Sequence, residues 1–408
     1  MKCRFCQHEL THEFIDLVNS PPSNSFLSPE ELNEPEVFYP LKLFVCEKCL
    51  LVQIDEYKKS EEIFSDKYAY FSSFSSSWLE HARRYVEMVA VRLGLNTESF
   101  VIEIGSNDGY LLQYFKEKNI PCLGIEPAKN TAEVARGKGI EVVTEFFGAE
   151  LAEQLAKQDK KANLLMGNNV LAHVPDINDF VKGLKILLRK DGVITLEFPH
   201  LMRLVEENQF DTIYHEHFSY LSFHTVNRIF SEHGLVLFDA EEIPTHGGSL
   251  RIYAGHQGDR SKELSPNVEA LYEKESAAGM ENLSYYFNFQ EKANKVKQDL
   301  LSFLLAQKRE GKKVVAYGAA AKGNTLLNYC GIKKDLIQFV VDASPHKQGR
   351  FLPGSHIAVL DEAEIKITKP DFVLILPWNI QEEIMQQVDY ISEWGGSFVI
   401  PIPELTVI

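Results

Sequence analysis

The chain has 408 residues, more than one ordinary hydrophobic core organises, so we expect two or three domains. Hydrophobic residues make up 45% and charged residues 25%, which is the usual balance of a soluble globular protein. The formal net charge of −16 argues against a general nucleic-acid binder. No apolar run reaches membrane-spanning length and the N-terminus lacks a signal-peptide core, so we expect no membrane partner and a cytoplasmic location.

Two cysteine pairs with the same spacing, Cys3-x-x-Cys6 and Cys46-x-x-Cys49, stand near the N-terminus. In a reducing compartment this pattern indicates one tetrahedral zinc site with four thiolate ligands rather than disulfides. Four protein ligands leave no open position for water or substrate, so we expect a structural Zn²⁺. The prolines between the two pairs predict a loop-rich segment with short strands, one of them at residues 41–45.

An aromatic and serine-rich stretch follows at residues 68–77 and includes Tyr70 and Ser73. It is too polar for a core strand, so it is either a solvated linker or a loop that folds over a ligand. We predict a loop that folds over a bound cofactor, with Tyr70 and Ser73 in contact with that cofactor. A helical period then runs over residues 78–95.

Strands and helices alternate in the next part of the chain. Helices are predicted at 110–117 and 130–139, and strands at 100–105, 122–125, 142–143, 164–169 and 192–198. This order predicts a parallel sheet with ligands at the carboxyl ends of its strands. An antiparallel strand at 246–253 is expected to finish that sheet.

An acidic turn containing glycines follows the first of these strands, and a carboxylate, Glu126, ends the second. Glycines let the backbone approach a ligand, and a carboxylate at the second strand end can accept both ribose hydroxyls. NAD uses a similar layout, but this turn lacks the G-x-G-x-x-G spacing and its acidity would repel a pyrophosphate. S-adenosylmethionine, which carries an ammonium and a sulfonium, is therefore favoured. The predicted contacts are Gly105, Asn107, Gly109, Glu126, Pro127, Asn168 and Asn169.

Residues 210–220 contain two imidazoles, two carboxylates and two phenols within a short segment. Such a density of proton-handling groups suits a site that removes a proton and holds a developing oxyanion. The alternative is a solvated loop rich in His and Tyr. A metal bound by His215 and His217 lacks a third ligand at a recognisable spacing. His173 and His200 end neighbouring strands, and we interpret both as structural.

A second α/β unit follows a long polar helix predicted at residues 281–307, and its strands are expected at 312–317, 338–342, 372–376 and 397–400. Its first strand leads through a turn of small residues, from Gly318 to Asn324, into a helix. Because this turn is basic, with Lys322 at its centre, the helix N-terminus suits an anion such as a nucleotide diphosphate. Lys347 and Arg350 can add positive charge there. A purely structural turn is the alternative.

Together these motifs resemble the nucleotide-sugar C-methyltransferases that build branched deoxysugars. The matching parts are the four cysteines, residues 103–109, Tyr214-His215-Glu216-His217 and residues 318–324, so the resemblance spans essentially the whole chain. It implies an α/β protein of three domains, with S-adenosylmethionine and structural zinc as cofactors. The three domains are a zinc-binding domain at 1–68, a Rossmann-like class I methyltransferase domain at 69–256, and a C-terminal Rossmann-like domain binding the sugar nucleotide at 257–408.

The resemblance also implies methyl transfer to carbon on a 4-keto-6-deoxy sugar nucleotide, with C-3 favoured over C-5. A carbon nucleophile forms by loss of a proton beside a carbonyl, which takes up the charge as an enolate. His217 is the implied base, Glu216 orients it or shares the proton, and Tyr214 donates a hydrogen bond to the enolate oxygen. His215 remains open as the base.

Two other functions stay open from the sequence. One is a methyltransferase that acts on oxygen or nitrogen of another small molecule, and the other is a non-catalytic, zinc-dependent binding protein. Three fused domains can build the whole cleft within one chain, so we expect a monomer.

Overall fold

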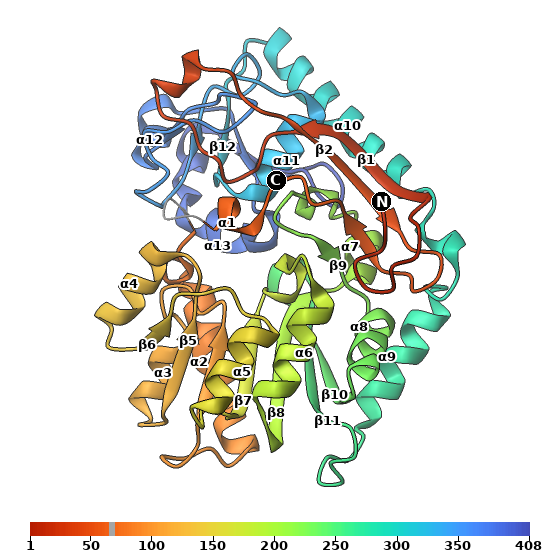
Figure 1. Ribbon diagram of the computed structural model, residues 1–408. Coiled ribbons are helices and arrows are strands. Elements are labelled where there is room, and N and C mark those ends of the chain that lie inside the picture. Colours follow the sequence, from red (N-terminus) through yellow and green to blue (C-terminus); the bar gives the residue numbers. More distant parts are fainter. Residues whose placement is uncertain (65–69) are drawn as a thin grey trace.

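The computed structural model describes residues 1–64 and 70–408, and its fold is mixed α/β with three sheets (Figure 1). The predicted domain boundary after residue 68, and Tyr68 at the start of the aromatic stretch, lie outside these residues. Within the described ranges, no helix combines the length and the apolar character needed to cross a membrane.

The N-terminal sheet has four strands, in the order β1 (His12–Ser20), β2 (Tyr39–Val45), β3 (Val52–Ile54) and β9 (Ser219–Tyr220). β2 contains the predicted strand, whereas the nine-residue β1 was not predicted. The fourth strand, β9, lies far away in the sequence, directly after the predicted catalytic segment. Val52 pairs with Tyr220 and Gln53 with Ser219, so the N-terminal domain is joined to that segment through a strand pair. A short helix, α1 (Ser60–Ile63), follows β3.

The central sheet has seven strands in the order β10-β11-β8-β7-β4-β5-β6. The bounds are β4 (Val101–Ile104), β5 (Cys122–Ile125), β6 (Glu141–Val143), β7 (Ala162–Asn168), β8 (Leu188–Pro199), β10 (Leu235–Ile243) and β11 (Ser249–His256). β11 is antiparallel to both of its neighbours, as predicted for the last strand, while β4 to β8 are parallel.

Helices cover both faces of the central sheet (Figure 1). Successive side chains on a strand point to opposite faces, and Val101 therefore joins the hydrophobic cluster of α2 while Ile102 joins that of α5 and α6. The helices are α2 (Ser76–Arg92), α3 (Leu112–Glu117), α4 (Lys129–Gly137), α5 (Ala149–Lys157), α6 (Ile177–Leu187), α7 (Leu201–Glu206), α8 (Phe223–Glu232) and α9 (Pro266–Ala277). α9 packs against α8 and β10, although the predicted boundary assigns it to the third domain.

The C-terminal sheet has six strands in the order β14-β13-β12-β15-β16-β17, all parallel except β17. The strands are β12 (Val314–Tyr317), β13 (Val340–Val341), β14 (Val359–Leu360), β15 (Phe372–Ile375), β16 (Ser397–Ile400) and β17 (Thr406–Val407), and the helices are α10 (Phe289–Arg309), α11 (Ala321–Cys330), α12 (Ala363–Thr368) and α13 (Gln381–Gln387). The predicted polar helix is α10, which starts later than expected because Asn288 is left-handed, with φ +70°.

The segment at 210–220 lies where the three domains meet. Thr325 of α11 donates a hydrogen bond to the Ile213 carbonyl at 2.8 Å, and the Trp378 indole donates to Asp211 at 2.8 Å. On the N-terminal side, the Ile54 amide donates to the Phe218 carbonyl at 3.2 Å. These contacts fix the predicted catalytic segment from two sides.

Candidate active site

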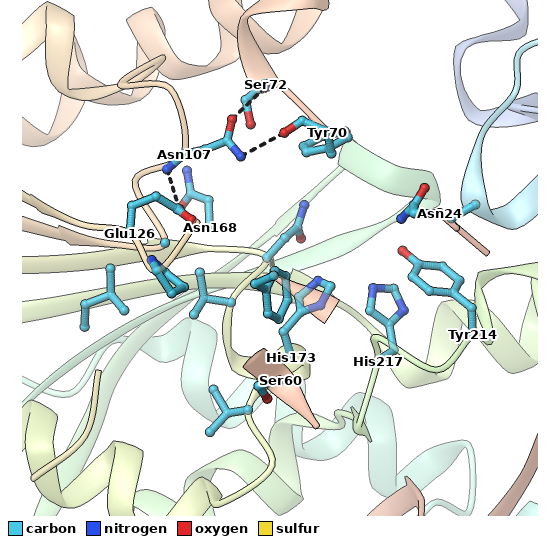
Figure 2. A pocket seen from close by; sticks show the side chains of 18 of the residues that line it. Asn24, Ser60, Tyr70, Ser72, Asn107, Glu126, Asn168, His173, Tyr214 and His217 are labelled. Atoms are coloured by element: carbon cyan, nitrogen blue, oxygen red, sulfur yellow. Dashed lines mark hydrogen bonds between the residues drawn. The ribbon is translucent and has the colours of Figure 1, made fainter. Parts of the chain in front are cut away.

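A cavity of about 540 Å³ lies between the three domains. Its wall combines the carboxyl ends of β4, β5 and β7, the segment at 210–220, and the turn between β12 and α11. Figure 2 shows side chains from the turn after β4, the ends of β5 and β7, and the segment at 210–220 converging on the same space. The glycine-containing turn after β4, the side chain of His217 and the basic turn after β12 therefore share one cavity.

The turn after β4 holds Glu126 in place at one end of this cavity. The Asn107 amide donates to Oε2 of Glu126 at 2.9 Å, and the Ala128 amide donates to Oε1 at 2.9 Å. Burial raises the pKa of Glu126 while these amides oppose the shift. Gly105 is required for the turn, because its φ is +67° and an added Cβ would lie 2.5 Å from Val170. A carboxylate thus faces the cavity in a fixed position.

Asn168 at the end of β7 supports the fit of a polar ligand. Its side chain lines the cavity, and within the described residues at most one of its buried Nδ2 and Oδ1 atoms is paired, with the Tyr110 hydroxyl. Buried amide atoms are normally paired, so the amide atom left unpaired suits a bound ligand. Together with Glu126, Asn168 fits the hydroxyl and amine groups of S-adenosylmethionine.

Residues 70–75 lie against the turn that follows β4. Asn107 Oδ1 accepts from the Ser72 amide at 2.9 Å, and its Nδ2 donates to the Tyr70 carbonyl at 3.1 Å (Figure 2). Tyr70 lines the cavity. Ser73 does not, because its amide donates to Asp108 at 3.3 Å and its hydroxyl accepts from Lys138 at 2.9 Å.

The other predicted donor contacts divide between the cavity wall and its support. Pro127 and Asn169 line the cavity, and the Asn169 amide donates to His246 at 2.6 Å. Gly109 lies outside the wall, where φ is +75° and an added Cβ would meet Ile140 at 2.5 Å. Gly109 therefore shapes the turn rather than facing the ligand.

Glu126→Ala should weaken binding of S-adenosylmethionine by about 1.5–3 kcal/mol, the usual contribution of a hydrogen bond to a charged group. Calorimetry should then show a roughly 10- to 150-fold higher dissociation constant. Glu133→Ala is the matched control, because Glu133 is exposed on the neighbouring helix α4. Unchanged affinity in the Glu126 variant would contradict the assignment.

His217 is held as a neutral imidazole. Its Nδ1 lies 2.8 Å from the Thr212 carbonyl, which can only accept, so Nδ1 carries the proton and Nε2 keeps its lone pair. Burial lowers the pKa of His217 well below its usual value, and the nearby His173 adds to the effect. The imidazole is therefore neutral near pH 7 and able to accept a proton.

Tyr214 lies beside this base. The two ring centroids are 4.0 Å apart, and both side chains project into the cavity (Figure 2). Burial raises the pKa of Tyr214 well above its usual value, so its hydroxyl stays protonated. A neutral imidazole and a protonated phenol thus lie side by side.

The other two residues of the predicted catalytic segment face away from the base. His215 donates to the Pro40 carbonyl at 3.2 Å and packs edge-on against Tyr39, outside the cavity wall. Glu216 accepts from Asn24 Nδ2 at 2.7 Å, and burial raises the pKa of this carboxyl to about 7. The orientation of His217 therefore comes from Thr212 rather than from Glu216.

The acidic limb of the pH profile should reflect the lowered pKa of His217. Protonation removes the lone pair of Nε2, so activity is lost only as the pH falls through that pKa. We expect kcat/KM for the acceptor to stay level down to pH 6.5, the ordinary pKa of histidine. It should decrease only at lower pH, where His217 becomes protonated. Half-maximal activity near pH 7 would instead point to Glu216.

The basic turn brings two of its predicted cations to the cavity. Lys322 donates to Asn379 at 2.6 Å and lies over the Trp378 ring, and burial lowers the pKa of this ammonium to about 8. Lys347 donates to the Ala319 carbonyl at 3.0 Å and to Asp342 at 3.1 Å. Both lysines line the cavity and can meet an anion there.

The remaining predicted contacts of the basic turn lie outside the cavity wall. Arg350 is exposed. Gly318 has φ +90°, and an added Cβ would meet Pro377 at 2.4 Å, so glycine is required for a close backbone approach. Asn324 is fully buried, and its side-chain amide has no partner within the described ranges.

The cavity wall also contains side chains that sequence reasoning missed. Asn24, Trp78, His246 and Asn379 all line it. So does His173, which we interpreted as structural, and its ring centroid lies 4.7 Å from that of His217. His200, by contrast, pairs with the buried Glu275 at 2.7 Å, in agreement with a structural role.

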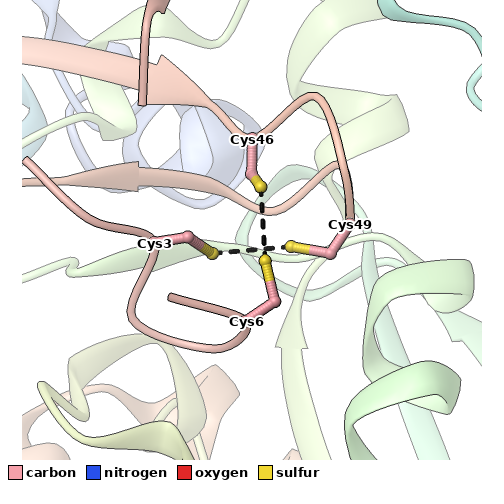
Figure 3. Close-up of side chains that lie close together, drawn as sticks. All are labelled: Cys3, Cys6, Cys46 and Cys49. Atoms are coloured by element: carbon pink, nitrogen blue, oxygen red, sulfur yellow. Dashed lines mark hydrogen bonds between the residues drawn. The ribbon is translucent and has the colours of Figure 1, made fainter. Parts of the chain in front are cut away.

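The four predicted zinc ligands converge in a separate cluster (Figure 3). Their sulfur atoms all lie within 4.8 Å of one another, with 3.5 Å between Cys3 and Cys49 and between Cys6 and Cys46. A tetrahedral zinc with bonds of about 2.3 Å needs sulfurs about 3.8 Å apart, so this arrangement fits the metal. Gln53 of β3 donates to the Cys3 sulfur at 3.2 Å and thereby links the cluster to the strand that pairs with β9.

Comparison with known proteins matches three successive parts of the chain to family models. These are a zinc binding domain at residues 3–64, a methyltransferase domain at 78–239 and a C-methyltransferase C-terminal domain at 244–403. The C-methyltransferase NovU of Streptomyces niveus is 33% identical over 407 residues, which cover 100% of this chain and 96% of NovU.

Two further similarities are confined to parts of the chain. The ubiquinone biosynthesis O-methyltransferase of Chelativorans sp. (strain BNC1) is 28% identical over 95 residues, covering 23% of this chain and 38% of that enzyme. The crystal structure of an S-adenosylmethionine-dependent methyltransferase from Clostridium acetobutylicum ATCC 824 is 10% identical, with a TM-score of 0.36, and covers 44% of this chain and 92% of that one.

Proposed function

The chain belongs to the C-methyltransferase family that includes NovU, and on that premise we propose that it methylates a nucleotide-linked 4-keto-6-deoxy sugar. It is an S-adenosylmethionine-dependent enzyme with a four-cysteine zinc-binding domain. The proposed position is C-3 of the sugar, and the proposed context is branched-sugar biosynthesis.

The observation that carries this proposal is the neutral imidazole of His217 next to the protonated phenol of Tyr214. Methyl transfer to oxygen or nitrogen does not need a proton-abstracting base flanked by an oxyanion donor. Methyl transfer to carbon needs both, because the nucleophile is an enolate. The pair lies in the same cavity as Glu126 and Asn168.

In the proposed reaction, S-adenosylmethionine supplies an electrophilic methyl group when it is bound against Glu126 and Asn168. His217 Nε2 takes the proton from the carbon next to the ketone, and Thr212 fixes the ring in the required tautomer. Tyr214 donates a hydrogen bond to the ketone oxygen as it gains charge. Positioning both ligands in one cavity supplies much of the rate enhancement.

Lys322 and Lys347 support a sugar nucleotide as the acceptor. Both line the cavity next to the start of α11, a helix of ten residues whose N-terminus favours an anion. We propose that they contact the diphosphate, with Gly318 and Asn324 shaping the turn and Arg350 contributing only long-range charge.

One chain supplies every part of this cavity, which supports a monomer as the functional unit. The zinc-binding domain contributes Asn24, the central domain Glu126 and His217, and the C-terminal domain Lys322. Four metal-binding thiols need a reducing compartment, so we place the enzyme in the cytoplasm.

The test is incubation of the protein with S-adenosylmethionine and a panel of 4-keto-6-deoxy sugar nucleotides. Mass spectrometry should find a product heavier by one methyl group, and NMR should place that group on C-3. The matching 4-hydroxy sugar nucleotides are the control, because they cannot form an enolate. Methylation of the 4-hydroxy compounds, or of an oxygen or nitrogen, would contradict the proposal.

A further inference from the structure

We infer that Asn24, which belongs to the zinc-binding domain, contacts the sugar of the acceptor, and that Glu216 is the positioning residue that fixes its amide. This assigns a substrate contact to the zinc-binding domain and a role to Glu216 other than proton transfer. The inference rests on the proposed function for the identity of the acceptor.

Asn24 is held in a loop that is docked against the C-terminal domain. The Leu27 amide donates to the Phe351 carbonyl at 3.0 Å, and Phe26 is buried in the cluster that joins the two domains. On the other side of Asn24, Ser23 Oγ lies 3.4 Å from Thr325 Oγ1, which itself donates to the carbonyl of Ile213. Asn24 is therefore fixed next to the catalytic segment.

Glu216 orients the side chain of Asn24. The Asn24 Nδ2 donates to Glu216 Oε1 at 2.7 Å, and Glu216 is only 4% exposed. Burying a carboxylate costs free energy, and a loop that needed only anchoring could use an apolar contact. The buried Oε1 acceptor of Glu216 instead determines which way the amide faces.

The oriented amide is available to a ligand. Asn24 lines the same cavity as Tyr214 and His217, and Figure 2 labels all three side chains around it. Apart from the bond to Glu216, the described part of the chain offers its side chain no other hydrogen bond. Oδ1 and the second N–H can therefore accept from a sugar hydroxyl and donate to a sugar oxygen.

The test separates positioning by Glu216 from proton transfer. Glu216→Gln keeps an oxygen that accepts from Asn24 but cannot transfer a proton, so it should lower kcat/KM less than Glu216→Ala, which leaves the Asn24 amide without its acceptor. Asn24→Ala should lower kcat/KM for the sugar nucleotide on the order of tenfold for each hydrogen bond lost, and Glu216→Ala should lower it in the same direction. None of these variants should change the affinity for S-adenosylmethionine. Asn33→Ala, in the same domain but exposed, is the matched control.

Sugar-nucleotide affinity and thermal stability are measured in parallel by calorimetry. Wild-type affinity and turnover in Asn24→Ala would overturn the inference, and so would a Glu216→Gln variant without activity, which would make Glu216 a proton-transfer group. A wild-type protein that binds the sugar nucleotides but methylates none of them contradicts the proposed function instead. One that binds none of them contradicts both.

Discussion

His217→Asn should lower methyl transfer by a factor of about 10²–10⁴, the usual contribution of a general base. The asparagine amide can still donate to the Thr212 carbonyl, as Nδ1 of His217 does at 2.8 Å. It places no lone pair where Nε2 stood. Both ligands should still bind, because the imidazole of His217 is uncharged and offers neither of them an ionic contact. The loss should therefore appear in kcat.

Exchange of the substrate proton with solvent deuterium measures the same step without methyl transfer. Wild type should exchange the proton next to the ketone, and His217→Asn should lose exchange and methylation together. His215→Asn is the matched control, since this histidine is two residues away and faces Pro40 instead of the cavity. Near-normal turnover in His217→Asn would assign the base to another residue.

Cys46→Ser should abolish zinc binding and unfold the N-terminal domain, rather than lower turnover in an otherwise intact enzyme. Structural zinc contributes on the order of 10 kcal/mol to folding in zinc-finger peptides. Here the metal would join two turns, each of which is closed by short-range hydrogen bonds such as Cys3 N to His8 O and Cys46 N to Leu51 O. Folded yield and the melting temperature should both fall.

Metal analysis and thermal unfolding by circular dichroism test this result. Wild type should carry one zinc per chain, and Cys122→Ser should keep it, because Cys122 lies on β5 away from the cluster. Freshly purified wild type without zinc would contradict the assignment. Full zinc content and an unchanged melting temperature in Cys46→Ser would do so as well.

Local patterns in the sequence predict most of the parallel strands in the central and C-terminal sheets, but β10, β14 and β17 were not predicted. The buried strand Val101–Ile104 and the glycine turn after it are fixed by neighbouring residues, as is the turn after β12. β1 is different, because register shifts after Glu13 and Asp16, with Val18 at φ +65°, interrupt the alternation that marks a strand. Its length depends on pairing with β2, which the local pattern does not show.

The candidate site divides in the same way. Tyr214 and His217 belong to one motif, so their proximity follows from the sequence. Asn24 reaches the cavity only because its loop docks on the distant α11, and no local signal marks it. His246 had a weak signal in the two glycines after it, but it was assigned to a strand, whereas β11 starts at Ser249 and His246 has φ +56°.

The pairing of β3 with β9 has a consequence for the order of folding. During synthesis, the edge of the N-terminal sheet stays open until the ribosome has delivered residue 220, more than half of the chain. All three residues of β3 are buried in the folded protein. Before β9 pairs with it, β3 is therefore an exposed edge strand that can pair with strands of other chains. The zinc-binding domain is thus contiguous in sequence but completes its folding only after the central domain has begun its own.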